Sequence, residues 1–126
     1  MLETREVFGL DFGGHVELTI TATNTTLTDA IRTYAEKRLS ILDRRFRDPV
    51  HVYLLIRKEQ TRKEDERFIA EVTIKLNRGV IRGEMRGDSP YTAVDHVSDT
   101  VTRQISRYKN RYSSKQRRDT EGGLGQ

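Results

Sequence analysis

The sequence contains no cysteine, which excludes a disulfide framework and any thiolate metal site. No apolar run approaches the roughly 20 residues that a helix needs to cross a bilayer, and the N-terminus has no basic segment followed by an apolar one. Hydrophobic residues form only 34% of the 126 residues, which is enough for one small core. We therefore expect one soluble, cytoplasmic domain with tails and no membrane association.

Residues that could carry catalysis are also sparse. His15, His51 and His96 fall on three different segments without the spacing of metal ligands, and no glycine-rich phosphate loop occurs. Asp95 and Asp99 share one side of a predicted helix and could hold a cation, but a solvated helix flank is the simpler interpretation. We expect no enzymatic activity, no cofactor, no metal and no small-molecule substrate.

Positive charge, by contrast, is concentrated near the C-terminus. Residues 103–118 contain seven of the 23 Lys and Arg residues and no Asp or Glu, so the formal net charge of +4 comes entirely from this segment. The helix dipole would account for about two or three cations at a helix end. A localised cationic surface of this size is typical of nucleic-acid-binding proteins.

The cationic segment continues a predicted helix that starts near Ser89, where a serine N-cap precedes Pro90 at the first helical position. Apolar residues three or four positions apart form one stripe: Val94, Val97, Val101, Ile105, Tyr108 and Tyr112. The cations recur on other sides of the helix: Arg103, Arg107, Lys109, Arg111, Lys115 and Arg118. We predict that the stripe packs on the domain and that the cations form an RNA-binding ridge.

Upstream, a period of two predicts four strands, and a period near 3.6 predicts another helix. The strands cover about residues 16–22, 50–56, 68–76 and 80–86, and the helix covers 26–46 with Thr26 and Asp29 as a weak capping box. Residues 58–66 are polar and are expected to form an exposed hairpin loop. The first helix carries a second, weaker cationic face: Lys37, Arg38, Arg44, Arg45 and Arg47.

The order of elements favours an α+β fold, β-α-β-β-β-α, like that of double-stranded-RNA-binding domains. Two helices would pack on one face of a four-stranded, mostly antiparallel sheet. Residues 1–14 lack a sustained period and are expected to be a flexible leader, whereas polar residues 113–126 would form a flexible tail or truncated linker. The domain would then span residues 15–112.

The run from Asp88 to Lys109 resembles the ribosome hibernation-promoting factor family, which includes ribosome-associated inhibitor A and protein Y. The matching positions in this run are Tyr91, Ala93, Val94, Asp95, Gln104, Ile105, Arg107 and Lys109. The first helix fits the family pattern at Thr28, Ala30, Ile31, Arg32, Tyr34, Arg38, Leu39 and Leu42. The sequence departs from the family at Ser89-Pro90, where Asp-Met or Asp-Leu is usual, and at Thr23-Asn24, where Gly-Arg is common.

The resemblance implies the N-terminal ribosome-binding domain of a factor that acts in stress and dormancy. Such a domain binds the small ribosomal subunit, with its 16S-type rRNA, and inhibits translation by occupying the channel for mRNA and tRNA. Lys and Arg rows on both helices would then neutralise rRNA phosphates. The alternative is a generic structured-RNA-binding module of double-stranded-RNA-binding type. We expect a monomer, since long family members dimerise through a C-terminal domain that this chain does not contain.

Overall fold

The structure is a computed structural model. It describes residues 3–10, 16–46, 50–76 and 78–122, with side chains between residues 16 and 109 except at positions 43, 47–49 and 77. The strands are β1 (Glu3–Leu10), β2 (Val16–Thr23), β3 (Val50–Lys58), β4 (Phe68–Leu76) and β5 (Gly79–Gly87). The helices are α1 (Asp29–Leu39) and α2 (Pro90–Gly122), with the short 3-10 helices η1 (Ser40–Arg45) and η2 (Glu64–Glu66).

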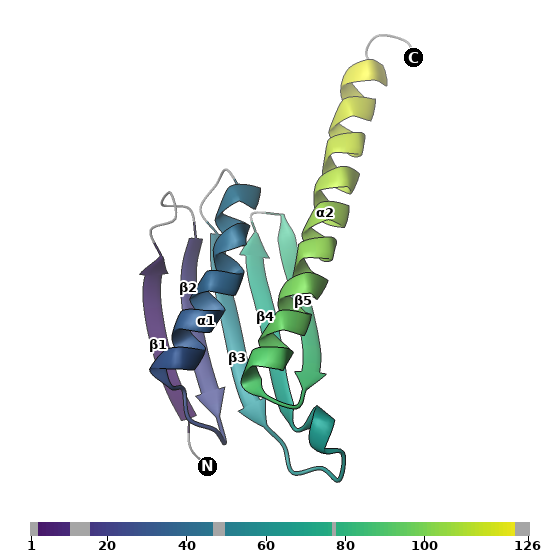
Figure 1. Cartoon of the computed structure of the whole chain (residues 1–126). Helices are drawn as coiled ribbons and strands as arrows, with labels where there is room; N and C mark the ends of the chain where they lie inside the picture. The colour runs from purple at the N-terminus through teal and green to yellow at the C-terminus, as the bar shows by residue number, and fades with distance from the viewer. Residues whose placement is uncertain (1–2, 11–15, 47–49, 77, 123–126) are drawn as a thin grey trace.

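The strands form one sheet in the order β1-β2-β3-β4-β5 (Figure 1). β2 and β3 are parallel because α1 crosses over the sheet between them, whereas the other three pairings are antiparallel. In the centre of the sheet Ile20 pairs with Leu54, which pairs with Val72. The prediction of a mostly antiparallel sheet is confirmed.

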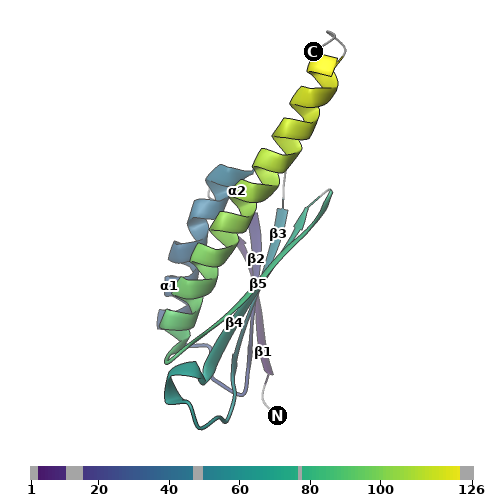
Figure 2. The same ribbon diagram turned by 90° about the vertical axis from the view of Figure 1, so that its right-hand side faces the viewer.

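Both helices lie on the same face of the sheet, as predicted (Figure 2). α2 packs mainly on β5 and β4, and α1 lies beside it. The alternation of apolar residues in β2 and β3 is reproduced as alternating burial, and the apolar stripe of α2 is buried from Val94 to Ile105. The core between the layers includes Leu18, Ile20, Leu39, Leu54, Val72, Ile74, Val97 and Val101.

Two glycines of β5 allow α2 to lie close to the sheet. A Cβ atom added at Gly87 would lie 2.7 Å from the backbone nitrogen of Ala93, and one added at Gly83 would lie 3.0 Å from a methyl group of Val101. The chain turns from β5 into α2 at Ser89, whose Oγ accepts a hydrogen bond from the Thr92 amide at 3.2 Å. The predicted N-cap at Ser89 is therefore confirmed.

The sheet has five strands, one more than the sequence predicted. β1 comes from the expected leader and pairs with β2 along its whole length, from Glu3 opposite Thr23 to Leu10 opposite Val16. Without β1, the outer edge of β2 would present unpaired backbone N–H and C=O groups, and another strand satisfies them. This pairing uses the backbone, so the weak side-chain periodicity of residues 3–10 gave no indication of it.

The two helices also differ from their predicted limits. Thr28, rather than Thr26, caps α1, since its Oγ1 accepts a hydrogen bond from the Ile31 amide at 3.1 Å. After Leu39 the chain tightens into η1 instead of continuing as α-helix. α2 continues through residues 113–122 of the expected tail, because no Gly or Pro interrupts it before Gly122.

Candidate nucleic-acid interface

Two residues of the predicted ridge of α2 lie on its exposed side. Arg103 and Arg107 are exposed, whereas Val101 and Ile105, which alternate with them along the helix, are fully buried. No described carboxylate forms an ion pair with either arginine. Helical spacing therefore presents two uncompensated cations on the side of α2 that faces away from the core.

The remaining ridge residues are placed differently. Lys109 is half-buried, and its Nζ lies 5.4 Å from the centroid of the Phe46 ring, within the range of a cation–π contact. Arg111, Lys115 and Arg118 lie on the described backbone of α2, but their side chains are outside the described residues. This last part of α2 extends past the end of the sheet (Figure 1).

The cations of the first helix fall into two groups. Lys37 and Arg44 are exposed, and neither makes an ion pair with a described side chain. Arg45 is half-buried, and Arg47 lies outside the described residues. Arg38 is different, because it points to α2 rather than away from the domain.

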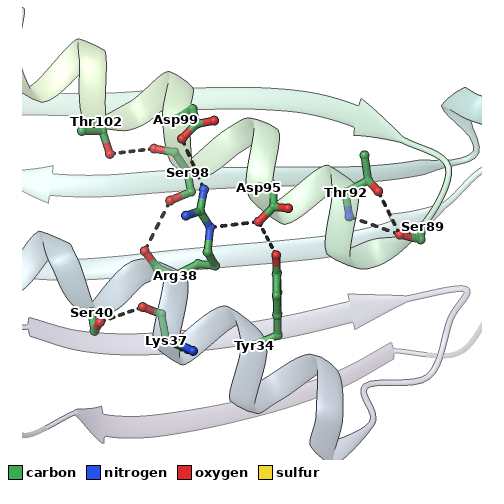
Figure 3. Close-up of polar contacts among 10 residues, drawn as sticks. All are labelled: Tyr34, Lys37, Arg38, Ser40, Ser89, Thr92, Asp95, Ser98, Asp99 and Thr102. Atoms are coloured by element: carbon green, nitrogen blue, oxygen red, sulfur yellow. Dashed lines mark hydrogen bonds and ion pairs between the residues drawn. The ribbon is translucent and has the colours of Figure 1, made fainter.

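Arg38 joins the two helices through ion pairs (Figure 3). Its Nε lies 2.9 Å from Asp95 Oδ1, and its Nη2 lies 3.2 Å from Asp99 Oδ1. Asp95 and Asp99 thus do hold a cation, as their spacing allowed, but this cation is the guanidinium of the same chain. Arg38 is consequently a neutralised cation and not part of the uncompensated set.

Tyr34 completes this contact between the helices. Its hydroxyl donates a hydrogen bond to Asp95 Oδ1 at 2.5 Å. This bond raises the pKa of the Tyr34 hydroxyl, with smaller contributions from desolvation and from the negative charge of Asp95. The ring of Tyr34 also meets that of Tyr91 edge-on, with centroids 5.2 Å apart. We call Tyr34, Arg38, Asp95 and Asp99 the interhelical cluster.

A buried serine continues the contact along α2. Ser98 is almost fully buried, and its Oγ donates a hydrogen bond of 3.4 Å to the backbone carbonyl of Arg38. Sequence reasoning did not identify this role or that of Tyr34, although Tyr34 and Asp95 are both among the motif positions. The partners lie about 60 residues apart in the chain, so only the folded structure shows that they meet.

The two described histidines lie on different elements, and His15 lies outside the described residues. His51 lies on β3, with its Nε2 2.8 Å from Thr19 Oγ1, and His96 lies on α2, with its Nδ1 3.0 Å from the Arg86 carbonyl. Within the described residues, no three His, Asp or Glu side chains are grouped so that they could bind a metal ion. None of the described helices is both long and apolar enough to span a membrane.

Comparison with known proteins identifies relatives of this chain. Residues 18–113 match the sequence model of the sigma 54 modulation protein / S30EA ribosomal protein family. Over 94 residues the chain is 36% identical to a ribosome hibernation promotion factor of Staphylococcus aureus (strain COL). That match covers 75% of this chain and 48% of the relative, so the chain spans about half the length of the curated protein.

Solved structures share the fold. The crystal structure of the N-terminal domain of Thermus thermophilus Protein Y superposes with a TM-score of 0.61 at 30% identity, over 72% of this chain and 93% of that one. A ribosomal subunit interface protein from Coxiella burnetii superposes with a TM-score of 0.53 over 76% of this chain and 98% of that one. Its identity is 20%, so this second match shows the fold alone.

Proposed function

Because this chain belongs to the sigma 54 modulation protein / S30EA ribosomal protein family, a family of ribosome-associated factors, we propose that it is a ribosome hibernation factor that binds the small ribosomal subunit. In this proposal the domain occupies the channel in which mRNA and tRNA would sit, and it blocks translation by its presence there. The curated relative is named a ribosome hibernation promotion factor, which supports a role in ribosome hibernation.

The observation that carries the proposal is the set of uncompensated cations on the helical layer. Arg103 and Arg107 on α2 and Lys37 on α1 are exposed and have no carboxylate partner among the described residues, and the same holds for Arg44 on η1. Each phosphate that such a cation neutralises releases a condensed counterion, which favours binding at low salt. We propose these four residues as rRNA contacts, with Arg111, Lys115 and Arg118 extending the row along α2.

The interhelical cluster has a different part in this proposal. Since Asp95 and Asp99 neutralise Arg38, a phosphate near Arg38 would have to compete with two carboxylates at 2.9 and 3.2 Å. We therefore propose that Arg38 positions the helices and that the contacts lie on either side of it. The domain would recognise the phosphate backbone and the shape of the folded rRNA, and not its base sequence, because the proposed contacts are point charges on helices.

The proposed inhibition is steric and requires no chemical step by the protein. It also requires no second copy, and we propose that the chain acts on one subunit as a monomer. The alternative, a generic binder of structured RNA, would use the same cations without a preference for ribosomes. The two proposals therefore differ in selectivity and not in the residues involved.

Competition with tRNA tests the proposal. Purified small subunits are loaded with mRNA and labelled tRNA, the protein is added, and the tRNA that remains bound is measured by filter retention. We expect the tRNA to be displaced at protein concentrations that saturate the subunit. Co-sedimentation with the subunit without displacement of tRNA would contradict the proposed position, and equal affinity for a long RNA duplex would favour the generic binder.

A further inference from the structure

The face of the sheet opposite the helices carries an ordered group of aromatic and cationic side chains. Both helices lie on the other side of the sheet (Figure 2), so this open face is formed by the alternate strand residues that point away from the core. Four of them stand in one register row, with Thr19 on β2, Tyr53 on β3, Thr73 on β4 and Arg82 on β5.

At one end of the open face, the charged side chains form ion pairs with one another. The Nη2 of Arg57 lies 2.6 Å from Glu84 Oε1, and the Nη1 of Arg86 lies 3.1 Å from Glu59 Oε2. Ile69, which pairs with both arginines in the sheet register, is 0% exposed although no helix covers this face. This end is therefore closed by paired side chains and offers little to a ligand.

The other end is built around two stacked rings. His51 and Tyr53 stack with centroids 4.2 Å apart and planes 15° from parallel. Thr19 Oγ1 lies 2.8 Å from His51 Nε2, which fixes the orientation of the imidazole ring, and the Nζ of Lys75 lies 5.3 Å from the centroid of Tyr53. We call His51, Tyr53, Lys75 and Arg82 the aromatic patch.

Charge at the aromatic patch favours a polyanion. Lys75 and Arg82 are exposed, and neither forms an ion pair with a described carboxylate. Glu17 stands in the same row as His51, and its carboxylate faces His51 at 3.8 Å; Glu71 lies one row beyond Tyr53, opposite Leu55. Two cations beside a pair of rings are the combination that single-stranded nucleic acids bind, since phosphates meet the cations and bases stack on the rings.

We propose that the aromatic patch is a second RNA-binding surface, which takes a single-stranded segment with a base stacked on the Tyr53–His51 pair and phosphates at Lys75 and Arg82. A single strand fits better than a duplex, because base faces are accessible only when they are unstacked. A second copy of this chain fits less well, since a two-fold contact would bring Lys75 and Arg82 against the same cations of its partner. The inference goes beyond the proposed function and does not depend on it.

Binding of a short, labelled oligouridylate to the full chain, followed by fluorescence anisotropy, tests the inference. Tyr53→Leu should weaken binding about tenfold, and Tyr53→Phe, which keeps the ring, should change it less than about twofold. Tyr91→Leu is the matched control, because it removes an exposed tyrosine from the helical layer and leaves the net charge unchanged. Each variant is also made with Arg103→Gln and Arg107→Gln, so that the helix cations cannot mask the effect.

A second measurement does not depend on whether the fold tolerates a substitution of Tyr53. Lys75→Gln with Arg82→Gln should make the log–log salt dependence of oligouridylate binding shallower by about 1.4, at about 0.7 per phosphate contact with a single strand. Ultraviolet cross-linking should attach the oligonucleotide to the strand that contains Tyr53. Equal affinities of Tyr53→Leu and Tyr91→Leu with an unchanged slope, or equal competition by duplex RNA, would overturn the inference. So would self-association of the chain that Tyr53→Leu abolishes.

Discussion

Arg38 on α1 and Asp95 on α2 are joined through an Nε to Oδ1 distance of 2.9 Å, and the same carboxylate oxygen accepts the hydroxyl of Tyr34. One carboxylate oxygen therefore accepts the Tyr34 hydroxyl and forms an ion pair with Arg38, one turn further along α1. Asp99 adds a further contact to the same guanidinium. The relationship fixes how the two helices, and hence their rows of cations, lie relative to each other.

A double-mutant cycle measures the strength of this contact. Arg38→Gln and Asp95→Asn should each lower the free energy of unfolding, and together they should show a coupling energy of about 0.5 to 1 kcal/mol, since both side chains are partly exposed. The measurement is chemical denaturation followed by circular dichroism. The Arg32–Asp29 pair, within one helix and with an exposed aspartate, is the control and should couple by about 0.3 kcal/mol. A coupling near zero for Arg38 and Asp95 would contradict a positioning role.

The salt dependence of ribosome binding separates neutralised from uncompensated cations. Arg38→Gln should leave the log–log salt slope unchanged, because the guanidinium is already paired with Asp95 and Asp99. Arg107→Gln should make the slope shallower by about 0.7 to 0.9, as expected for one lost phosphate contact. Both are measured by small-subunit binding over a salt series. A slope change of this size in Arg38→Gln would mean that Arg38 leaves the carboxylates for a phosphate.

Alkaline pH should weaken the interhelical cluster through Tyr34. The hydrogen bond to Asp95 raises the pKa of Tyr34 in the folded state above its ordinary value of about 10, so the folded state holds this proton more tightly than the unfolded state. The stabilisation is therefore complete below about pH 10 and is lost as the pH rises through the raised pKa. Unfolding free energy measured between neutral and alkaline pH should fall more steeply for the wild type than for Tyr34→Phe. Parallel curves for the two proteins would contradict this role of Tyr34.

The approach of α2 to β5 depends on the absence of a side chain at position 87. Gly87→Ala should lower the unfolding free energy by about 1 to 3 kcal/mol, because the new Cβ would lie 2.7 Å from the Ala93 backbone nitrogen and the helix would have to shift. Gly83→Ala should cost less, because its Cβ would meet side-chain methyl groups and no backbone atom, the nearest being Val101 Cγ1 at 3.0 Å. Thermal denaturation of both variants gives the comparison. A larger loss at position 83 would contradict the argument.

The sequence was sufficient to predict which residues are buried wherever burial follows the period of a single helix or strand. Alternation located β2 and β3, and the three-to-four spacing of Val94, Val97, Val101 and Ile105 located the buried side of α2. The same spacing placed Arg103 and Arg107 on the exposed side. These predictions succeed because a residue's face within a helix or strand is decided by its immediate neighbours.

Features that depend on distant parts of the chain were not predictable in this way. Arg38 was predicted to belong to the rRNA-binding face of the first helix, and its carboxylate partners lie about 60 residues away on another helix. β1 is held by backbone pairing with β2. The Tyr53–His51 pair lies on an uncovered face of the sheet only because both helices pack on the opposite face. The start of α1 was misplaced for another reason, since Thr28 and Thr26 are equally good caps by residue type.

Affinity for purified small ribosomal subunits over a salt series, compared for two charge-matched variants, decides whether the helix cations bind rRNA. Arg103→Gln with Arg107→Gln removes two exposed cations from α2, and Arg62→Gln with Lys63→Gln removes two exposed cations from the loop between β3 and β4. We predict a weaker affinity and a slope shallower by about 1.4 to 1.8 for the helix variant alone, with both variants fully folded. An equal loss of affinity in the loop variant would show that binding follows net charge, and it would contradict a specific interface on the helices.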